Sequence, residues 1–332
     1  MLRPPVEPMR CVGVAELPEP RMCRGGCAYE VKFDGWRCLA FSRQDGVYLQ
    51  SRRAKDLTPF FPDVAAAVRE TLPAGTVVDG ELIIFDTEVG RTVFPALLGR
   101  ITAGRRLRRE AAARPANLVV FDVLAAAGDD LTGLPLRQRR TRLEQMLVNA
   151  PPTLVLCPQT YDVELARTWF DELGVTGAEG LVVKDLAGVY RVGGRGSTWW
   201  KYKRKVTVEA IVGGVIGAVE EPRALLLGRF DDHGRRLRYV ARTVPLALSQ
   251  RQEIGRMLTA SGGVHQWPQP LPAAWIGQVD RREPQPYQQV EPLLVVEVVV
   301  DQAYDQGRYR HPVRLLRLRA DVDPADVERW RP

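Results

Sequence analysis

The residues Lys32-Phe33-Asp34-Gly35-Trp36-Arg37 directly follow an alternating run, Ala28-Tyr29-Glu30-Val31. The run predicts a β-strand, and the Asp-Gly pair predicts a tight turn at its end. Such a turn exposes Lys32 at the strand end and brings Arg37 back towards the same place. Because burial and neighbouring cations readily lower the pKa of a lysine, Lys32 is suited to act as a nucleophile. The alternative is an ordinary hairpin with a solvated lysine and arginine.

Further short motifs follow along the chain, several of them at the ends of predicted strands. Lysines 201 and 203 alternate with aromatic residues, so we expect both lysines on one face of a strand. The motifs are Ser51-Arg52, Asp79-Gly80-Glu81, Phe121-Asp122, Glu179-Gly180-Leu181-Val182-Val183-Lys184, Trp199-Trp200-Lys201-Tyr202-Lys203, Arg310-His311-Pro312 and Arg319-Ala320-Asp321.

In this order, the motifs K-x-D-G-x-R, E-G-x-V-x-K and W-x-K-x-K resemble those of the covalent nucleotidyltransferases, which include ATP-dependent DNA ligases, RNA ligases and mRNA capping enzymes. The resemblance covers about residues 8 to 323 and is greatest to small bacterial ATP-dependent DNA ligases, including the ligase module of end-joining ligases. It implies sealing of 3′-hydroxyl/5′-phosphate nicks in duplex DNA, through a lysyl-AMP and a DNA-adenylate, in DNA repair. The alternatives are an RNA ligase of the same superfamily and a catalytically inactive nucleic-acid-binding module.

The resemblance assigns a catalytic role to four residues and a nucleotide-binding role to a larger set. Lys32 would take AMP from ATP, with Asp34, Lys201 and Lys203 assisting. Glu179 and Glu81 would hold Mg²⁺ or Mn²⁺, since hard oxygen ligands suit these ions. The nucleotide-binding set is Glu30, Arg37, Arg52, Glu81, Phe121, Lys201, Lys203, Arg310, Arg319 and Asp321.

Within that set the resemblance implies particular contacts. Glu30 would border the adenine, and Phe121 would stack on it. Arg37 and Glu81 would bind the ribose, and Arg52 would meet the 5′-phosphate at the nick. Each position also has a plainer interpretation. Phe121 can be a core residue, Glu179 a surface acid before a strand, and the two lysines a polar strand face.

The motif near the carboxyl end departs from the family pattern. Many members have a lysine directly after R-x-D, whereas Val322 follows Asp321 here. That lysine would help to orient the pyrophosphate of ATP. Arg310 and Arg319 remain candidates for the role, and Arg314 or Arg317 could compensate for the missing lysine.

The overall composition favours a polyanionic partner. The chain has 332 residues and a formal net charge of +7, with arginine-rich runs at residues 105–109 and 137–142. We therefore expect nicked double-stranded DNA as the partner, and a repair polymerase or a DNA-end-binding protein as a recruiting partner. We expect a monomer that contacts no membrane, because no stretch is apolar and long enough to cross one.

The cysteines indicate a reducing compartment. Five cysteines form an odd, sparse set, which argues against a disulfide framework and predicts a cytoplasmic, nucleoid-associated protein. Cys23 and Cys27 have three residues between them, but no second pair lies close enough to predict a zinc site.

Strand patterns punctuated by helices predict an α+β fold with two domains. Residues 1–204 would form an adenylyltransferase domain of antiparallel sheets flanked by helices, with an irregular arm over residues 1–26. Helices are expected at 62–71, 105–114, 137–148 and 163–174. Residues 205–332 are rich in β-patterns with a helix at about 249–259. They would form an OB-fold barrel, a prediction that depends mostly on the resemblance.

Overall fold

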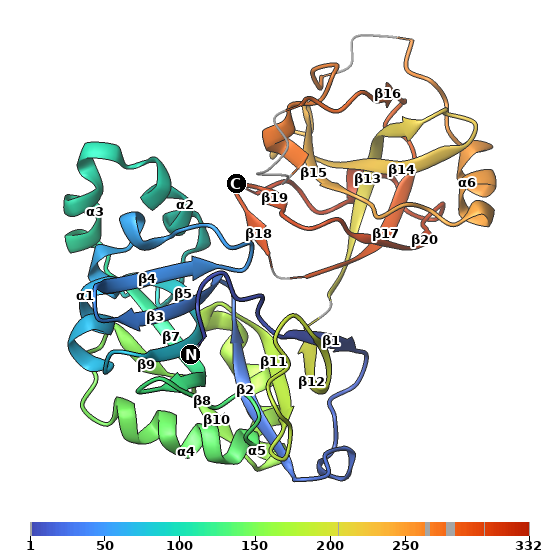
Figure 1. Cartoon of the computed structure of the whole chain (residues 1–332). Helices are drawn as coiled ribbons and strands as arrows, with labels where there is room; N and C mark the ends of the chain where they lie inside the picture. The colour runs from blue at the N-terminus through green and yellow to red at the C-terminus, as the bar shows by residue number, and fades with distance from the viewer. Residues whose placement is uncertain (1, 205, 263–265, 277–282, 302, 332) are drawn as a thin grey trace. The chain divides into compact units, whose positions relative to one another are not determined.

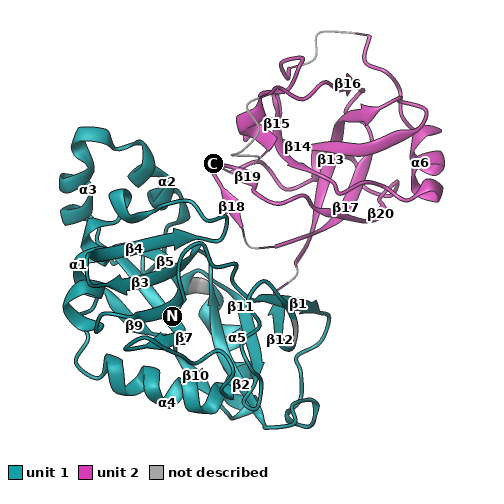
Figure 2. Cartoon of the chain, in the orientation of Figure 1, with its two compact units in different colours: residues 1–203 teal, residues 204–332 magenta. Residues whose placement is uncertain are grey.

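A computed structural model of the chain describes residues 2–204, 206–262, 266–276, 283–301 and 303–331. The chain divides into two compact units, Met1–Lys203 and Arg204–Pro332 (Figure 2). The predicted domain boundary, after residue 204, lies one position from this division. The mixed α+β character expected from the sequence is confirmed. In the described part of the chain, no helix combines the length and the apolar character that a membrane crossing requires.

The first unit contains two sheets, which we call the first and the second sheet. The first has the strand order β1-β12-β11-β2-β10, and the second has the order β4-β3-β5-β7-β8 with β6 beside β5 and β9 beside β7. Most pairs are antiparallel; β1 with β12 and β7 with β9 are parallel. The strands are β1 (Arg10–Val14), β2 (Cys27–Phe33), β3 (Trp36–Arg43), β4 (Gly46–Ser51), β5 (Thr76–Asp86), β6 (Arg91–Thr92), β7 (Ala116–Ala126), β8 (Asp129–Asp130), β9 (Leu154–Leu156), β10 (Gln159–Thr160), β11 (Ala178–Asp185) and β12 (Arg195–Lys203).

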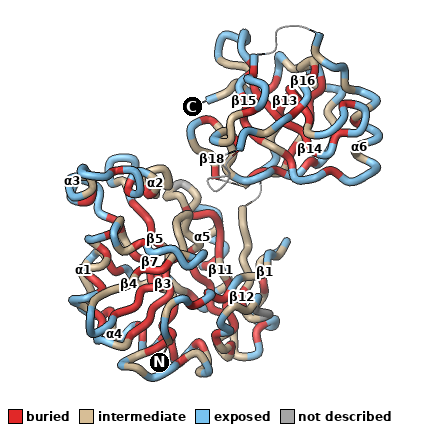
Figure 3. Tube along the Cα trace, turned by 45° about the horizontal axis from the view of Figure 1, so that its top comes forward, coloured by how far each residue is buried: buried red, intermediate tan, exposed pale blue. Residues whose placement is uncertain are grey.

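The second sheet is apolar on both faces, and its two faces pack against different layers. In β3, Cys38 and Ala40 belong to the cluster that contacts the helices, whereas Leu39 and Phe41 pack with Trp199 of the first sheet. This alternation follows from the two-residue period of a strand. Buried residues therefore follow one another along β3, β5 and β7 (Figure 3). The two sheets therefore share a core, beside which the functional residues lie.

Helices cover the outer faces of this pair of sheets (Figure 1). Val64 and Val68 of α1 and Leu143 of α4 enter the core of the second sheet, and Ala166 of α5 packs with Tyr29 beneath the first sheet. The four helices expected in this unit are confirmed to within a few residues, and α2 was not expected. The helices are α1 (Pro62–Thr71), α2 (Phe94–Thr102), α3 (Leu107–Ala113), α4 (Leu136–Leu147) and α5 (Val163–Glu172).

Two local expectations and one alternative were wrong. The arm over residues 1–26 is not wholly irregular, because Arg10–Val14 forms β1 beside β12. The Asp-Gly pair does not close a hairpin, since β2 belongs to the first sheet and β3 to the second. The motif Asp79-Gly80-Glu81 was expected to close a strand over residues 76–78, but β5 continues through it to Asp86.

The cysteine pattern is resolved into one disulfide and three free thiols. Cys23 and Cys27 are bonded to each other, while Cys11, Cys38 and Cys157 are free. The sequence argued against a disulfide framework, and the one disulfide that is present, between Cys23 and Cys27, was not predicted. Its two cysteines pack under the first sheet with Tyr29 and Leu181.

The second unit is built on one six-stranded sheet of order β15-β14-β13-β17-β20, with β16 beside β13. Its core contains Val212, Leu227, Val240 and Val296, with Ile254 from α6. A small two-stranded sheet, β18 with β19, adjoins it. The elements are β13 (Val206–Gly217), β14 (Pro222–Phe230), β15 (Leu237–Arg242), α6 (Leu248–Gly255), β16 (Gln288–Gln289), β17 (Val295–Val300), β18 (Tyr304–Asp305), β19 (Arg308–Tyr309) and β20 (Arg314–Leu318).

The barrel predicted for this unit is not closed by a continuous ladder in the described residues. One isolated parallel bridge, Thr243 with Val313, joins the chain after β15 to the chain before β20. Its hydrogen bonds run from Val313 N to Arg242 O and from Val244 N to Val313 O, each 2.8 Å long. Pro245 and Pro312 flank the bridge and lack a backbone N–H, which limits the pairing there.

A buried ion pair fastens α4 to the second sheet and gives a stability prediction. Arg139 and Asp122 are both fully buried, and the guanidinium bonds both carboxylate oxygens, at 2.8 and 2.9 Å. Arg139→Met should destabilise the first unit by about 3–5 kcal/mol, because it leaves the Asp122 charge buried without its partner. Urea denaturation measures this loss. Arg142→Met, at an exposed position of the same helix, is the control and should change stability by about 0.5 kcal/mol or less. Similar values for both variants would contradict the role given to the pair.

Candidate active site

Lys32 lies in a row of residues that crosses three adjacent strands of the first sheet. In the ladder register, Gly180 of β11 stands opposite Lys32 of β2 on one side and Lys203 of β12 on the other. Its neighbour Glu179 accepts both ammonium groups on one carboxylate oxygen, at 2.6 Å from Lys32 Nζ and 2.8 Å from Lys203 Nζ. Gly180 has φ +144°, and a Cβ there would lie 2.2 Å from Tyr202 O. Only glycine fits this crossing point.

The shared carboxylate controls the protonation of both partners. Burial raises the pKa of Glu179, but Lys32 and Lys203 outweigh burial and hold it at about 2. Burial lowers the pKa of Lys32, but Glu179 and Glu81 outweigh burial and raise it above the ordinary lysine value. The expectation that its surroundings lower the pKa of this lysine is therefore wrong for the protein without nucleotide. Carboxylates, and not cations, dominate the environment of the amine.

Glu81 approaches the same amine from the second sheet. Burial raises the pKa of its carboxyl to about 7, with Lys32 and Arg37 acting in the opposite direction. The residue is half-buried, and no hydrogen bond or ion pair of its carboxylate is found among the described residues. The turn at Gly35 brings the two sheets together here, since a Cβ on Gly35 would lie 2.2 Å from Leu82 O and 3.0 Å from Glu81 Cγ.

Three further predicted residues surround this centre. Lys201 lies two residues before Lys203 on β12, and burial, Lys203 and Lys32 together lower its pKa. Asp34 is half-buried directly after β2, and its charge contributes to the raised pKa of Lys32. Arg52 is exposed in the turn after β4, close enough for its charge to contribute to the lowered pKa of Lys201.

Arg37, predicted to bind ribose, is held by an acid that sequence reasoning gave no role. Its Nε and Nη2 donate to the two carboxylate oxygens of Asp79, at 2.5 and 2.6 Å, and Nη2 also donates to Met9 O. Tyr190 completes the group by donating to Asp79 at 2.7 Å. Burial is the largest influence on Arg37, yet Asp79 outweighs it and raises the pKa of the guanidinium. The ribose contact of Arg37 stays a prediction.

Glu30 and Phe121 meet at Lys184, the last residue of the E-G-x-V-x-K motif. Lys184 Nζ is 2.7 Å from Glu30 Oε2 and donates to Phe121 O at 3.2 Å, and both charged groups are buried. The ammonium lies 4.5 Å from the centre of the Phe121 ring, and Arg37 lies 4.7 Å from it. Glu30 thus holds Lys184 through a buried ion pair, and the adenine contacts of Glu30 and Phe121 stay predictions.

The remaining predicted residues belong to the second unit. Arg310, after β19, forms an ion pair with Asp305 at 2.6 Å. Arg319, after β20, bonds Asp321 with Nε and Nη2, both at 2.9 Å, and also contacts Glu209. Thus the structure brings together Lys32, Asp34, Glu81, Glu179, Lys201 and Lys203 in the first unit. It places Arg310, Arg319 and Asp321 in the other unit.

The site also contains residues that the sequence did not single out. Asp79 and Lys184 stood within quoted motifs, so their motif membership was a usable signal. Gln159, which donates to Glu30 at 3.0 Å, stood in no motif. No signal in one sequence could have assigned it to the pocket, because only the pairing of β10 with β2 brings it there.

The control of Lys32 by Glu179 can be tested without any enzymatic reaction. Glu179→Gln keeps the side-chain shape but removes the charge that favours the ammonium form, so burial then dominates and the pKa of Lys32 should fall. The folded chain is acetylated over a range of pH and then digested, and mass spectrometry of the peptides gives the pH midpoint of Lys32 acetylation. The midpoint should move to lower pH in the variant, with exposed Lys55 as an internal reference. An unchanged midpoint would show that Glu179 does not govern the amine.

Comparison with known proteins assigns this pocket to a family. The model of the ATP dependent DNA ligase domain matches residues 9–203. DNA ligase C2 of Mycolicibacterium smegmatis is 31% identical over 96% of this chain and 92% of that protein. DNA ligase C of Mycobacterium tuberculosis is 31% identical over 97% and 92%.

Solved structures agree with these relatives. A mycobacterial DNA ligase D complexed with ATP and MES is 26% identical, with a TM-score of 0.51 over 98% of both chains. A structure of Lig E DNA ligases, 17% identical with a TM-score of 0.58, shares the fold and covers 94% of this chain and all of that one. The family model covers the unit that holds Lys32, and the relatives match nearly the whole chain, so this protein belongs to the ATP-dependent DNA ligases.

Proposed function

We propose that this ligase seals nicks with a 3′-hydroxyl and a 5′-phosphate in duplex DNA, in DNA repair, and that Lys32 carries the AMP. The observation that supports this most strongly is the row of Lys32, Glu179 and Lys203 across β2, β11 and β12. It gathers one nucleophile, one acid and a second cation at a single point. Phosphoryl transfer depends on such positioning and on neutralising charge at the phosphate oxygens.

In the first step, Lys32 Nζ forms a bond to the α-phosphorus of ATP while the bond from that phosphorus to the β-phosphate bridging oxygen breaks and pyrophosphate leaves. Only the neutral amine can attack. Burial favours this form, and Glu179 and Glu81 oppose it. The free enzyme therefore keeps the amine protonated until the two carboxylates are engaged elsewhere, which would couple reactivity to nucleotide binding.

The carboxylates of Glu179 and Glu81 would hold Mg²⁺ or Mn²⁺. The acids fit such a site, because Glu179 stays ionised with a pKa of about 2 and Glu81 offers a carboxylate without a partner in the described chain. Mg²⁺ is usually bound by one or two carboxylates plus substrate phosphates, which two acids at one site would provide. The ion would supply charge neutralisation at the phosphates.

Two further transfers would complete sealing. The DNA 5′-phosphate takes AMP from Lys32, forming the DNA-adenylate, and the 3′-hydroxyl then displaces AMP. Lys201 and Lys203 would face the α-phosphate in both steps, and exposed Arg52 would meet the DNA 5′-phosphate. Largely phosphate-directed contacts would bind the duplex with little sequence preference. Recruitment by a repair polymerase or a DNA-end-binding protein, to DNA in the cytoplasm, belongs to the same proposal.

We also propose that the second unit is an OB-fold. The order β15-β14-β13-β17-β20, with α6 between β15 and β17 in the chain, supports this assignment. So does the isolated parallel bridge of Thr243 with Val313, which joins the chain just after edge strand β15 to the chain just before edge strand β20, where a barrel would close. In this proposal Arg319 and Arg310 would orient the pyrophosphate, where the family lysine is replaced by Val322.

The nucleophile can be identified by labelling. Lys32→Ala should abolish transfer of ³²P-AMP from α-labelled ATP to the protein, and should also abolish nick sealing, because Lys203, the other lysine of the row, would face the phosphate and not attack it. Lys55→Ala, at an exposed lysine, is the matched control and should label normally. Labelling that persists in Lys32→Ala would place the nucleophile elsewhere. Parallel sealing assays on nicked DNA and nicked RNA separate a DNA ligase from an RNA ligase.

The role of Arg319 can be separated from folding by comparing two steps. Arg319→Ala should lower self-adenylylation by about a hundredfold, the typical effect of removing one group that stabilises a transition state. Sealing of a pre-adenylylated nick should change far less, because pyrophosphate takes no part in it. Arg256→Ala, at an exposed arginine after α6, is the control. Equal losses in both assays would mean that Arg319 acts through folding or DNA binding instead.

A further inference from the structure

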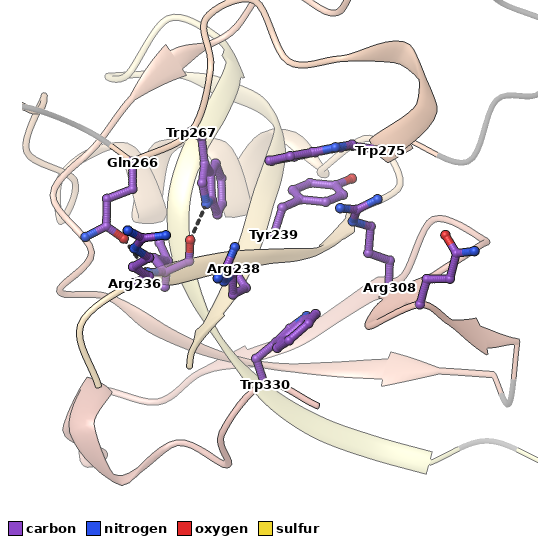
Figure 4. Close-up of a pocket in the computed structure, with 10 residues that line it drawn as sticks. Arg236, Arg238, Tyr239, Gln266, Trp267, Trp275, Arg308 and Trp330 are labelled. Carbon is purple, nitrogen blue, oxygen red and sulfur yellow. Dashed lines mark hydrogen bonds between the residues drawn. The ribbon is translucent and has the colours of Figure 1, made fainter. Parts of the chain in front are cut away.

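The second unit contains a cavity that the ligase chemistry above does not use. Its volume is about 830 Å³, within the range of about 300–1,000 Å³ typical of ligand sites. It lies against β15 and the β18–β19 hairpin, and all of its described lining belongs to this unit (Figure 4). The side chains that carry the argument are Arg236, Arg238, Tyr239, Trp275, Arg308 and Trp330.

Aromatic rings provide two flat surfaces in this cavity. Tyr239 and Trp275 lie nearly parallel, with their ring centres 6.1 Å apart and their planes inclined by 27°. Trp330 faces the cavity from another side (Figure 4). It is fixed by hydrogen bonds from its Nε1 to Gly307 O, at 2.9 Å, and from its backbone N to Phe230 O. Trp275 and Trp330 are only half-buried, so aromatic surface remains available to a ligand.

The described charged residues that line the cavity are all basic. None of the described lining residues is acidic. Arg308 lies 4.6 Å from the ring centre of Trp275, and Arg238 lies 5.6 Å from that of Trp330. Neither these two nor Arg236 forms an ion pair with a described residue, unlike Arg310, Arg317 and Arg319 of the same unit. Burial lowers the pKa of Arg308, which is the direction expected for a cation without a counter-charge.

We propose that this cavity binds an unpaired nucleotide of a DNA strand, with the base stacked on the aromatic rings and the phosphate held by the arginines. Every base has a flat face that stacks on aromatic side chains, and guanidinium groups suit phosphate oxygens. An apolar protein segment would leave the three guanidinium groups without counter-charges, so it fits the cavity less well. The inference rests on the proposed function in taking DNA as the polymer, and it adds single-stranded segments beside a nick or break to the substrate.

The test uses the full chain and a fluorescent single-stranded oligodeoxyadenylate of about six nucleotides, with binding followed by anisotropy. Arg308→Ala and Trp275→Leu should each weaken binding about tenfold, in the range of one lost stacking contact. Arg256→Ala removes the same charge outside the cavity and is the matched control, with a much smaller effect. Arg308→Lys keeps the charge without the planar group and should restore only part of the affinity. Thermal melting checks that each variant is folded.

The competing ligands are distinguished in the same assay. An abasic strand of equal length should bind more weakly than the base-bearing strand and should be insensitive to Trp275→Leu. Equal binding of both strands, equal effects of Arg308→Ala and Arg256→Ala, or displacement of the strand by AMP or inorganic phosphate at equal concentration would each overturn the proposal. Lys32→Ala should bind the strand like the unmodified chain. If the unmodified chain fails to take the AMP label, that result contradicts the ligase mechanism alone. The strand-binding result still tests the cavity.

Discussion

The active site depends on one carboxylate shared by two ammonium groups. Glu179 binds Lys32 and Lys203 through a single oxygen, in a partly dehydrated place where electrostatic attraction is much stronger than in water. Without that charge the two lysines, with Lys201 nearby, would repel one another where burial already disfavours charge. The three strands could still pair, but no attraction would hold the ammonium groups close together. The constraint is therefore both structural and chemical: the acid that assembles the cations also keeps the nucleophile protonated.

Behind this centre, buried ion pairs lie within each sheet, and their cations also form hydrogen bonds that reach beyond it. Asp79 of the second sheet binds Arg37, whose guanidinium also reaches Met9 O in the segment before β1. Lys184 of the first sheet bonds Phe121 O of the second sheet. Each buried charge in these groups has a partner and further hydrogen bonds, the condition under which a buried pair is tolerated. These directional bonds fix the positions of the side chains that lie behind the active site.

Much of this arrangement could be predicted from the sequence, and the remainder has identifiable causes. Lys32, Glu179 and Lys203 were recognised because their motifs are short, local and chemically distinctive. The helix at 62–71 was predicted to the residue. In contrast, the hairpin alternative for residues 32–37 was wrong, because one sequence does not say which sheet a strand joins. The parallel pairing of β1 with β12 joins residues nearly two hundred positions apart, and no local pattern encodes it. The raised pKa of Lys32 was missed for the same reason, since Glu179 approaches from a distant strand.

Charged groups of this protein fall into two kinds: buried ion pairs that stabilise the fold, and charged groups at the proposed binding sites that have no bonded partner among the described residues. Arg139 with Asp122, and Lys184 with Glu30, are balanced pairs at buried positions, and they hold elements together. Glu81 is different: burial raises its pKa to about 7, and no described group bonds its carboxylate. A half-buried carboxyl that forms no hydrogen bond contributes little to the stability of the fold, so such a group is expected where a ligand binds it. By this criterion we expect the Glu81 carboxylate to bind a cation in the first unit. We expect the arginines beside the aromatic rings of the cavity to bind an anion in the second unit. The two proposals therefore call for ligands of opposite charge: Mg²⁺ or Mn²⁺ at the carboxylates of the first unit, and a DNA phosphate at the arginines of the second.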